Sequence, residues 1–331
     1  MMQNSKCSVD AWTERYPIDG QFRISRNSKT EAEVVVCRIS SDERSGYGEC
    51  VPYPRYGETT ESVLDAINQA AKQLGGDIGH DRLQEALPPG AARNALDCAL
   101  WDLQAKISGR HVHSLVCRLP PRPVETAFTV SLDTPDAMAN VARGVSSRPV
   151  LKIKLGGKDD IAIMHAVAAA APRSRIIADA NEAWTPDTLP ELMREAARVR
   201  IALIEQPLPA GKDELLAEIP HPIPICADES AHIVDDLEAL RDRYDTVNIK
   251  LDKTGGLTEA VRMRERAREL GFGVMVGCMV GTSLSMAPAV LLAQDADYID
   301  LDGPLLLARD RMPALSYSGN MVSPPRAELW G

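Results

Sequence analysis

The sequence predicts an α/β protein in which a (β/α)8 barrel follows a smaller α+β domain. The chain has 331 residues, and single hydrophobic cores stop growing near ~250 to 300 residues. From residue 125 onward, short apolar runs alternate with stretches rich in Ala, Leu, Glu and Arg at helical spacing, a pattern typical of βα units and a parallel sheet. Eight such runs occur, and eight parallel strands with intervening helices close into a barrel.

The first 120 residues show a different pattern. Residues 31–39 (EAEVVVCRI) form a β-branched run that predicts a strand. Two helices are expected next, over residues 61–74 and from Gly90 to Gly109, where alanines and leucines recur at helical spacing. The sequence LPPRP at residues 119–123 breaks the pattern. We therefore place the domain boundary there and expect an α+β domain over residues 1–120.

The barrel is expected over residues 121–304. Its eight candidate strands share short length and aliphatic or β-branched character; they are ETAFTVSL, VLKIKLG, RIIADAN, VRIALIEQP, PIPICADES, DTVNIKLDK, GVMVGCMV and DYIDLDG. Residues 305–331 contain no further strong βα unit and are expected to pack back on the first domain.

Composition narrows the class of function. The 44% hydrophobic and 25% charged residues are typical of a soluble globular protein. A net charge of −10 disfavours nucleic acid or an anionic membrane as the main partner, so we expect a small-molecule substrate. No apolar stretch reaches the ~18 residues of a membrane helix, and the start carries no signal-like apolar region. The seven cysteines include no C-x-x-C pair, so a cytoplasmic protein with reduced thiols is expected.

Ionisable residues follow the predicted strands in a regular series. In this fold the chemistry is built at the carboxyl ends of the strands. The residues at those ends are Lys152 and Lys154, Asp179, Glu205, Asp228, Lys250, and Asp300 with Asp302. From Lys154 to Lys250 the steps are 25, 26, 23 and 22 residues, one βα unit each. These side chains should therefore converge on one mouth of the barrel.

Three of these residues predict a metal site. Asp179, Glu205 and Asp228 supply one carboxylate from each of three consecutive strands, which are hard oxygen ligands suited to Mg²⁺ or Mn²⁺. A single acid at a strand end more often caps a helix or accepts a turn hydrogen bond. Three acids in the same register favour a metal.

The lysines predict acid–base chemistry. Side chains at i and i+2 of a strand point to the same face, so Lys152 and Lys154 both enter the barrel mouth. Lys250, four strands on, should face them across the pocket. A second ammonium, the cation and partial desolvation should lower the pKa of such a lysine toward a useful value. A lone K-x-K is usually a solvated edge strand, but its register with the acids and Lys250 favours a catalytic role.

This arrangement indicates a reaction class. A cation beside a carbonyl group acidifies the adjacent C–H bond, one lysine removes that proton, and a second lysine returns a proton to the opposite face. The outcome is 1,1-proton transfer, which is racemisation or epimerisation. Sites with a lysine base and Mg²⁺ are a described pattern in enolase-superfamily enzymes.

Nine segments carry a family resemblance over nearly the whole chain. They are GECVPYPRYGE, AARNALDCALWDL, LKIKL, IADANEAW, IEQPLP, CADES, VNIKLDKTGGLTEA, GCMVGTS and DLDGP. With these the sequence resembles the enolase superfamily, its muconate-lactonising-enzyme subgroup, and within it the L-Ala-D/L-Glu (dipeptide) epimerases. The resemblance implies a modified, TIM-like (β/α)8 barrel whose mouth is closed by loops of the N-terminal α+β domain, which would act as a capping domain.

The resemblance also implies roles for the core of the site. Asp179, Glu205 and Asp228 match the Mg²⁺ ligands, and Lys154 and Lys250 match the acid/base pair. The implied activity is Mg²⁺-dependent epimerisation of L-Ala-D/L-Glu-type dipeptides, and the implied role is murein (peptidoglycan) peptide recycling.

The remaining site residues concern the substrate. Lys152 matches the first lysine of the motif and should support the enolate electrostatically. Asp300 and Asp302 match the D-x-D that holds the α-ammonium group of a dipeptide, and paired carboxylates suit that charge. Arg26 and Lys29, in a loop near the barrel mouth, are the candidate cations for a substrate carboxylate.

Other functions remain open at this point. The same lysines and metal serve o-succinylbenzoate synthase or cycloisomerase chemistry, although such substrates carry no ammonium group for the D-x-D. A Schiff-base aldolase using Lys250 without metal, and a non-catalytic dipeptide-binding protein, are further alternatives. The sequence leaves open whether the protein is a homo-oligomer and which second residue of a dipeptide it prefers.

Overall fold

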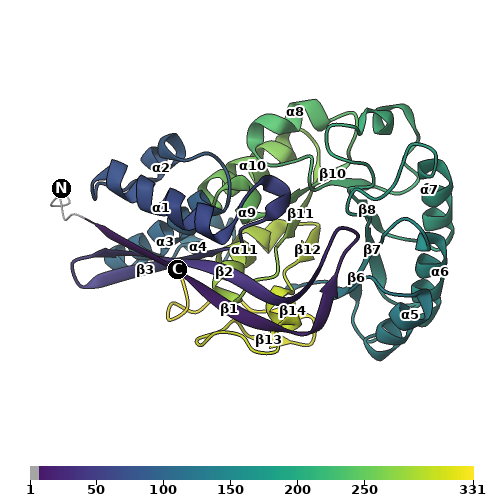
Figure 1. Ribbon diagram of the computed structural model, residues 1–331, viewed down its shortest axis with the longest axis horizontal. Helices are drawn as coiled ribbons and strands as arrows, with labels where there is room; N and C mark the ends of the chain where they lie inside the picture. Colours follow the sequence, from purple (N-terminus) through teal and green to yellow (C-terminus); the bar gives the residue numbers. More distant parts are fainter. Residues whose placement is uncertain (1–6) are drawn as a thin grey trace.

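A computed structural model describes residues 7–331 of the chain and places two assemblies side by side (Figure 1). The N-terminal assembly is an antiparallel sheet in the order β1-β2-β3, with helices against one face. Its strands are β1 (Ser8–Arg23), β2 (Ser28–Ser41) and β3 (Arg44–Cys50). The helices that follow are η1 (Pro54–Tyr56), α1 (Thr60–Leu74), α2 (His80–Ala86), α3 (Ala91–Ser108) and α4 (His113–Val116).

The second assembly is the expected parallel barrel. Its strands run in the order β5 to β12, and Ala127 N–H donates to Ile299 O at 2.8 Å, which joins the first strand region to the last. The strands are β5 (Phe128–Val130), β6 (Val150–Lys154), β7 (Arg175–Asp179), β8 (Leu203–Glu205), β9 (Ile225–Ala227), β10 (Thr246–Ile249), β11 (Gly273–Gly277) and β12 (Tyr298–Asp300). The (β/α)8 prediction is confirmed.

Helices surround this barrel, with one departure from the expected pattern. They are α5 (Pro135–Gly144), α6 (Asp160–Ala170), α7 (Leu189–Arg198), η2 (Glu214–Glu218), η3 (Val234–Asp236), α8 (Leu237–Leu240), α9 (Leu251–Thr254), α10 (Leu257–Glu269), α11 (Ser283–Leu292), η4 (Ala293–Asp295) and η5 (Gly303–Leu306). Between β8 and β9 only the 3₁₀ helix η2 forms. Prolines before and after η2, at positions 207, 209, 220, 222 and 224, lack the N–H that an α-helix needs.

Local signals explain the helices that the sequence predicted. Helix α1 begins at a reciprocal cap, because the Thr59 hydroxyl accepts from Ser62 N–H at 3.1 Å and Thr59 N–H donates to Ser62 Oγ at 2.9 Å. It ends at Gly75, whose φ of 61° is left-handed. Helix α3 ends in the same way at Gly109, with a φ of 68°. Strands β1 and β3 and helix α2 were not predicted.

The C-terminal residues contact both assemblies. Strands β13 (Tyr317–Ser318) and β14 (Met321–Val322) form a small sheet with β4 (Val124–Glu125). The indole N–H of Trp330 donates to Cys98 O at 3.0 Å, and Gly331 N–H donates to a carboxylate oxygen of Asp102 at 2.9 Å. The division into residues 1–120 and 121–304 stays a prediction.

No helix within residues 7–331 has the length and apolar character to cross a membrane. The seven cysteines are free thiols.

Strand β3 packs on helix α3 through glycines that leave no room for a side chain. A Cβ at Gly48 would overlap Ala95 O and Ala99 N, and a Cβ at Gly46 would overlap Ala99 O and Leu103 N, all backbone atoms of α3. Backbone atoms of a helix cannot move aside as a flexible side chain can. The close approach of β3 to α3 therefore depends on both glycines.

We expect Gly48→Ala to lower the free energy of unfolding by about 3 kcal/mol, because the new methyl group forces β3 away from α3. Urea unfolding followed by circular dichroism measures the change. Gly144→Ala is the matched control, since no atom outside its chain neighbours and its own helix backbone lies within 4 Å of a Cβ there, and the residue is helical. It should leave stability unchanged or raise it by up to ~1 kcal/mol. Equal stability of the two variants would contradict this packing argument.

Candidate active site

The strand register places the predicted acids and lysines in one row. Lys154 on β6 is the register partner of Asp179 on β7, and Asp179 is the partner of Glu205 on β8. Glu205 pairs with Cys226 on β9, so Asp228, two residues further, points to the same face. The four side chains are buried, with residue exposures between 0% and 7%. Adjacent parallel strands thus bring together residues that lie a βα unit apart in sequence.

A cavity lies where the barrel meets the N-terminal assembly; we call it the central cavity. Its barrel wall consists of Lys154, Asn181, Asp228, Glu229, Lys250, Cys278, Met279 and Val280. Its N-terminal wall consists of Phe22, Ile24, Asn27, Lys29, Val51, Tyr53 and Tyr56. Lys154 and Lys250 reach this cavity from β6 and from the end of β10, four strands apart. Two ammonium groups therefore flank the same enclosed space.

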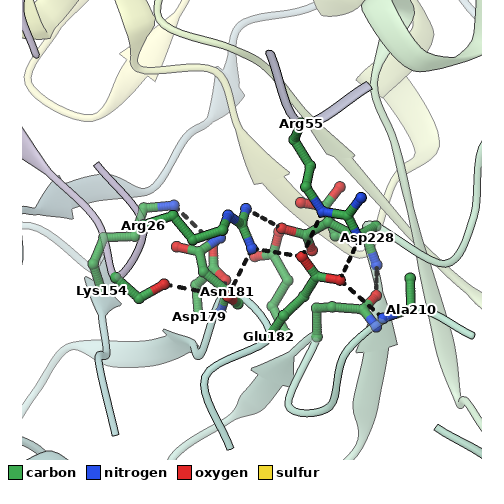
Figure 2. Close-up of polar contacts among 12 residues, drawn as sticks. Arg26, Arg55, Lys154, Asp179, Asn181, Glu182, Ala210 and Asp228 are labelled. Atoms are coloured by element: carbon green, nitrogen blue, oxygen red, sulfur yellow. Dashed lines mark hydrogen bonds and ion pairs between the residues drawn. The ribbon is translucent and has the colours of Figure 1, made fainter. Parts of the chain in front are cut away.

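Lysines pair with the carboxylates at the strand ends. Lys154 Nζ lies 2.7 Å from an oxygen of Asp179, and Lys250 Nζ lies 2.6 Å from Asp228. Figure 2 labels Lys154 and Asp179. Lys152 does not line the cavity. Its ammonium lies 2.7 Å from Glu205, 2.8 Å from Asp300 and 3.2 Å from Asp179.

The expected lowering of the lysine pKa values included the charge of a bound cation, and the protein groups alone have the opposite effect at two of the lysines. Burial lowers the pKa of Lys250, but the charges of Asp228 and Glu205 outweigh it and raise the pKa well above its usual value. Lys152 behaves in the same way, because Asp300, Glu205 and Asp179 outweigh its burial. The pKa reasoning from sequence gave too little weight to the carboxylates that lie within 3 Å.

The carboxylates do not share one protonation behaviour. Burial raises the pKa of Asp179, but the ammonium groups of Lys154 and Lys152 outweigh it and hold the pKa at about 2. Glu205 has a raised pKa, because burial and the neighbouring charge of Asp179 act in the same direction. The pKa values of two neighbouring carboxylates in this site are therefore shifted in opposite directions.

The donor chemistry at these strand ends fits a hard divalent cation. Within residues 7–331, no three His, Cys, Asp or Glu side chains are drawn together around a common point. The ammonium of Lys152 lies among them instead. One oxygen of Glu205 is buried and accepts no well-formed hydrogen bond, although Lys152 Nζ is 2.7 Å away. Carboxylate oxygens from Asp179, Glu205 and Asp228 on one face are the ligand type that Mg²⁺ and Mn²⁺ take.

The D-x-D pair lies at the end of β12, outside the walls of the central cavity. One oxygen of Asp300 accepts from Lys152 Nζ at 2.8 Å, and the other is buried without a hydrogen bond. Asp302 accepts from Thr129 N–H at 2.6 Å. Burial and the charge of Asp300 raise the pKa of Asp302 to about 7. An unpaired carboxylate oxygen beside a second carboxylate offers a place for a cationic group.

The two candidate cations of the N-terminal loop are placed differently. Lys29 lines the central cavity, where burial lowers its pKa, and its Nζ lies 5.7 Å from the ring centre of Tyr53. Within residues 7–331 its ammonium forms neither a hydrogen bond nor an ion pair. Arg26 does not line the cavity, because protein acceptors hold its guanidinium: Asn181 O at 2.7 Å, Glu182 at 2.7 Å and Glu229 at 2.5 Å.

Lys253 was missed by the sequence reasoning. Its side chain is fully buried, and its ammonium lies 2.7 Å from a carboxylate oxygen of Asp228 and 2.5 Å from Asp228 O. It also donates to Asn248 O at 3.0 Å. A lysine three residues after Lys250, in the short helix that starts there, turns back toward the strand end. That i, i+3 spacing was the available signal.

Comparison with known families adds independent information. Residues 136–325 match the family described as enolase C-terminal domain-like. Residues 6–117 match the mandelate racemase / muconate lactonizing enzyme N-terminal domain. The chain belongs to the enolase superfamily. Both halves of the chain match its muconate-lactonising-enzyme subgroup. The sequence motifs predicted this subgroup.

Two named relatives align with almost the whole of this chain. The L-Ala-D/L-Glu epimerase of Escherichia coli K12 is 44% identical over 313 residues, which are 94% of this chain and 98% of the relative. The N-acetyl-D-glutamate racemase of a Pseudoalteromonas species is 47% identical over 304 residues, 90% of this chain and 95% of the relative.

Solved structures agree with the fold. One is an enolase family member from Agrobacterium tumefaciens with homology to dipeptide epimerases, described with bound sodium, L-Ala-L-Glu and an ordered loop. It is 55% identical to this chain, with a TM-score of 0.97. The match covers 98% of this chain and 100% of the other. A dipeptide epimerase from Enterococcus faecalis, complexed with Mg and L-Leu-L-Tyr, is 26% identical with a TM-score of 0.90, covering 97% and 98%.

We expect Lys152→Met to lower the free energy of unfolding by about 3 to 5 kcal/mol in EDTA, because three buried carboxylates lose their shared ammonium. Asp179 keeps the ammonium of Lys154, but the other two carboxylates are left without a cationic partner. Unpaired buried carboxylates have raised pKa values in the folded state, so the stability that their protonation gives is lost as pH rises. The deficit relative to the unmodified protein should therefore be larger at pH 8 than at pH 5.

Urea unfolding at the two pH values measures this deficit. Lys72→Met, at an exposed position of α1, is the control and should change stability by less than ~0.5 kcal/mol. A Lys152→Met deficit that does not depend on pH would show that the carboxylates are not what the lysine stabilises.

Proposed function

We propose that the protein is a Mg²⁺-dependent epimerase of L-Ala-D/L-Glu-type dipeptides that works by 1,1-proton transfer through an enolate. The observation that carries the proposal is the pair Lys154 and Lys250, which line one cavity from strands four apart, each with a carboxylate partner within 3 Å. The named activity of the Escherichia coli relative supports it. The reaction makes the protein an isomerase.

The two lysines would divide the proton transfer between them. A substrate in the central cavity lies between Lys154 and Lys250, so one neutral amine removes the α-proton from one face while the other ammonium delivers a proton to the opposite face. In the reverse direction the roles exchange. Lys152, buried among carboxylates, would hold positive charge near the enolate side without lining the cavity.

Asp179, Glu205 and Asp228 would hold the metal. When bound, Mg²⁺ supplies positive charge that stabilises an enolate and offsets the carboxylate charge that raises the pKa of Lys250. The Mg found with a dipeptide in the Enterococcus faecalis structure supports this choice of ion, and Mn²⁺ has the same oxygen preference.

The substrate's charged ends would be recognised by separate groups. We assign the α-ammonium to Asp300 and Asp302, since Asp300 has a buried oxygen without a hydrogen bond. We assign the side-chain carboxylate of the second residue to Lys29, whose ammonium lines the cavity and has no ion pair within residues 7–331. Arg26, predicted from sequence for the same role, has its guanidinium on protein acceptors.

The wider role follows from this chemistry as part of the same proposal. An L-Ala-D/L-Glu epimerase handles dipeptides of the kind released from murein, so we propose a cytoplasmic enzyme of peptidoglycan recycling. Residues 1–120, with 305–331 packed on them, would form the capping domain that closes the barrel of residues 121–304.

A second candidate function is racemisation of an N-acyl glutamate. The Pseudoalteromonas relative is named for N-acetyl-D-glutamate. Both substrates contain an N-acylated glutamate with the same acidic C–H bond at its α-carbon. Only the dipeptide also carries an ammonium group. The D-x-D pair favours the dipeptide, because a neutral acetyl group gives buried carboxylates no partner.

The proposal is tested by proton NMR of L-Ala-L-Glu and L-Ala-D-Glu in D₂O with protein and Mg²⁺. We expect loss of the glutamate α-proton signal together with appearance of the other diastereomer, and EDTA should stop both. N-acetylglutamate is measured in parallel. A persistent α-proton in the dipeptides would remove support for the assignment, and exchange in N-acetylglutamate alone would favour the second function.

We expect Lys154→Ala and Lys250→Ala each to reduce epimerisation at least ~1,000-fold, since each removes one of the two proton-transferring groups. The same NMR experiment measures this. A variant that still exchanges the α-proton of a single epimer identifies which lysine serves which face. Full epimerisation by either variant would overturn the two-base scheme.

We expect Asp302→Asn to raise the KM for L-Ala-L-Glu at least about tenfold, because a charge-assisted hydrogen bond to the ammonium is lost. The amide oxygen can still accept from Thr129 N–H. Since the pKa of Asp302 is about 7, protonation below that pH should also raise the KM of the unmodified protein, and the variant should lack this dependence. Asp242→Asn, at an exposed position, is the control; an unchanged KM for Asp302→Asn would exclude this role.

A further inference from the structure

The carboxylate of Glu182 lies at the centre of a polar network beside the central cavity. It accepts from Arg26 at 2.7 Å, from Arg55 at 2.9 and 2.8 Å, and from Ala210 N–H at 2.9 Å (Figure 2). A carboxylate offers about four acceptor positions, and all four are used here. The side chain is only 7% exposed. No acceptor capacity remains for a substrate, so Glu182 acts on other protein groups.

The two arginines come from separate segments that build the N-terminal wall of the central cavity. Arg26 lies between β1 and β2, in the segment that contributes Phe22, Ile24 and Lys29 to the wall. Arg55 lies in η1, between the wall residues Tyr53 and Tyr56. Glu182, in contrast, follows β7 of the barrel. One barrel carboxylate therefore links both segments of the wall to the barrel.

A second set of contacts fixes the Arg26 segment at the same place. Arg26 also donates to Asn181 O at 2.7 Å and to Glu229 at 2.5 Å, and the hydroxyl of Ser25 donates to Asn181 O at 3.2 Å. Arg55 has no partner within residues 7–331 other than Glu182, and its side chain is 39% exposed. The Arg55 segment thus depends on Glu182 more than the Arg26 segment does.

The backbone around Glu182 is fixed in an uncommon conformation. Asn181 and Glu182 have φ values of 44° and 66°, in the left-handed region that residues with side chains seldom adopt. Glu182 N–H donates to Gln206 O at 2.9 Å, which ties this turn to the segment after β8. Such conformations persist only where the surroundings hold them in place. The turn presents the Glu182 carboxylate to both arginines from a rigid base.

We propose that Glu182 is a positioning residue that holds the Arg26 and Arg55 segments closed over the central cavity and thereby sets the affinity for substrate. The inference rests on the proposed function for what the substrate is. Glu182 touches no reacting atom, and its effect passes through Arg26 and Arg55. If only a fraction of the molecules has both segments closed, the apparent dissociation constant rises by the inverse of that fraction.

The first test needs no substrate. Hydrogen–deuterium exchange of the full protein compares Glu182→Gln with the unmodified chain, since glutamine keeps the shape but replaces an acceptor oxygen with a donor. We expect amides of residues 22–29 and 53–57 to exchange about tenfold faster, while those of β7 are unchanged. Unchanged exchange in both segments overturns the proposal, whatever the substrate proves to be.

The second test is kinetic and uses L-Ala-L-Glu. Glu182→Gln should raise KM about tenfold, equivalent to ~1.4 kcal/mol, with kcat falling less than threefold. Arg55→Met should act in the same direction. The double variant should be no worse than Glu182→Gln alone, because the two residues form one interaction. A loss confined to kcat, or additive effects in the double variant, overturns the proposal.

A matched control separates this network from ion pairs in general. Glu269→Gln breaks the pair of Arg266 and Glu269, 2.8 Å apart and with side chains 40% and 64% exposed, and should leave KM, kcat and the exchange of both segments unchanged. If the unmodified protein epimerises no dipeptide, the proposed function fails while the exchange experiment still decides the role of Glu182.

Discussion

The structure depends on a balance of buried charge at the carboxyl ends of the barrel strands. Carboxylates at the ends of three consecutive strands lie between lysines there, and each of these three carboxylates is tolerated in the interior because an ammonium group lies within about 3 Å of it. The period of two along a strand directs these side chains inward, and the parallel register sets them beside one another. When one of these groups gains or loses a proton, the pKa values of its neighbours change. Such coupling between neighbouring groups suits a site that transfers protons.

Much of this site could be predicted because it is periodic. Acids and lysines at intervals of one βα unit must meet when the strands align, so Lys154, Asp179 and Glu205 follow from spacing alone. The sign of the lysine pKa shifts could not be predicted, since it depends on distances of 2.6 to 2.8 Å that no spacing gives. Lys253 was missed because it lies on a helix, outside the strand period.

The N-terminal assembly was harder to predict from sequence. Strand β1 alternates exposed with half-buried residues and packs little apolar surface, so no hydrophobic run marks it. It forms because β2, whose central residues are buried, offers it a pairing edge. The fate of Arg26 was equally hidden. Its partners Glu182 and Glu229 lie more than 150 residues away in the chain, and only the docking of the hairpin on the barrel brings them together.

The hairpin of β1 and β2 also makes contact with a late part of the chain. Ile18 bridges to Leu307, and Ala308 N–H donates to Pro17 O at 2.8 Å. These partners are roughly 290 residues apart, and contacts of such sequence separation form slowly because a long loop must close first. The contacts of Pro17 and Ile18 can form only after the chain has been synthesised through residue 308. The hairpin that carries Arg26 and Lys29 is therefore expected to gain its last anchoring contacts late in folding.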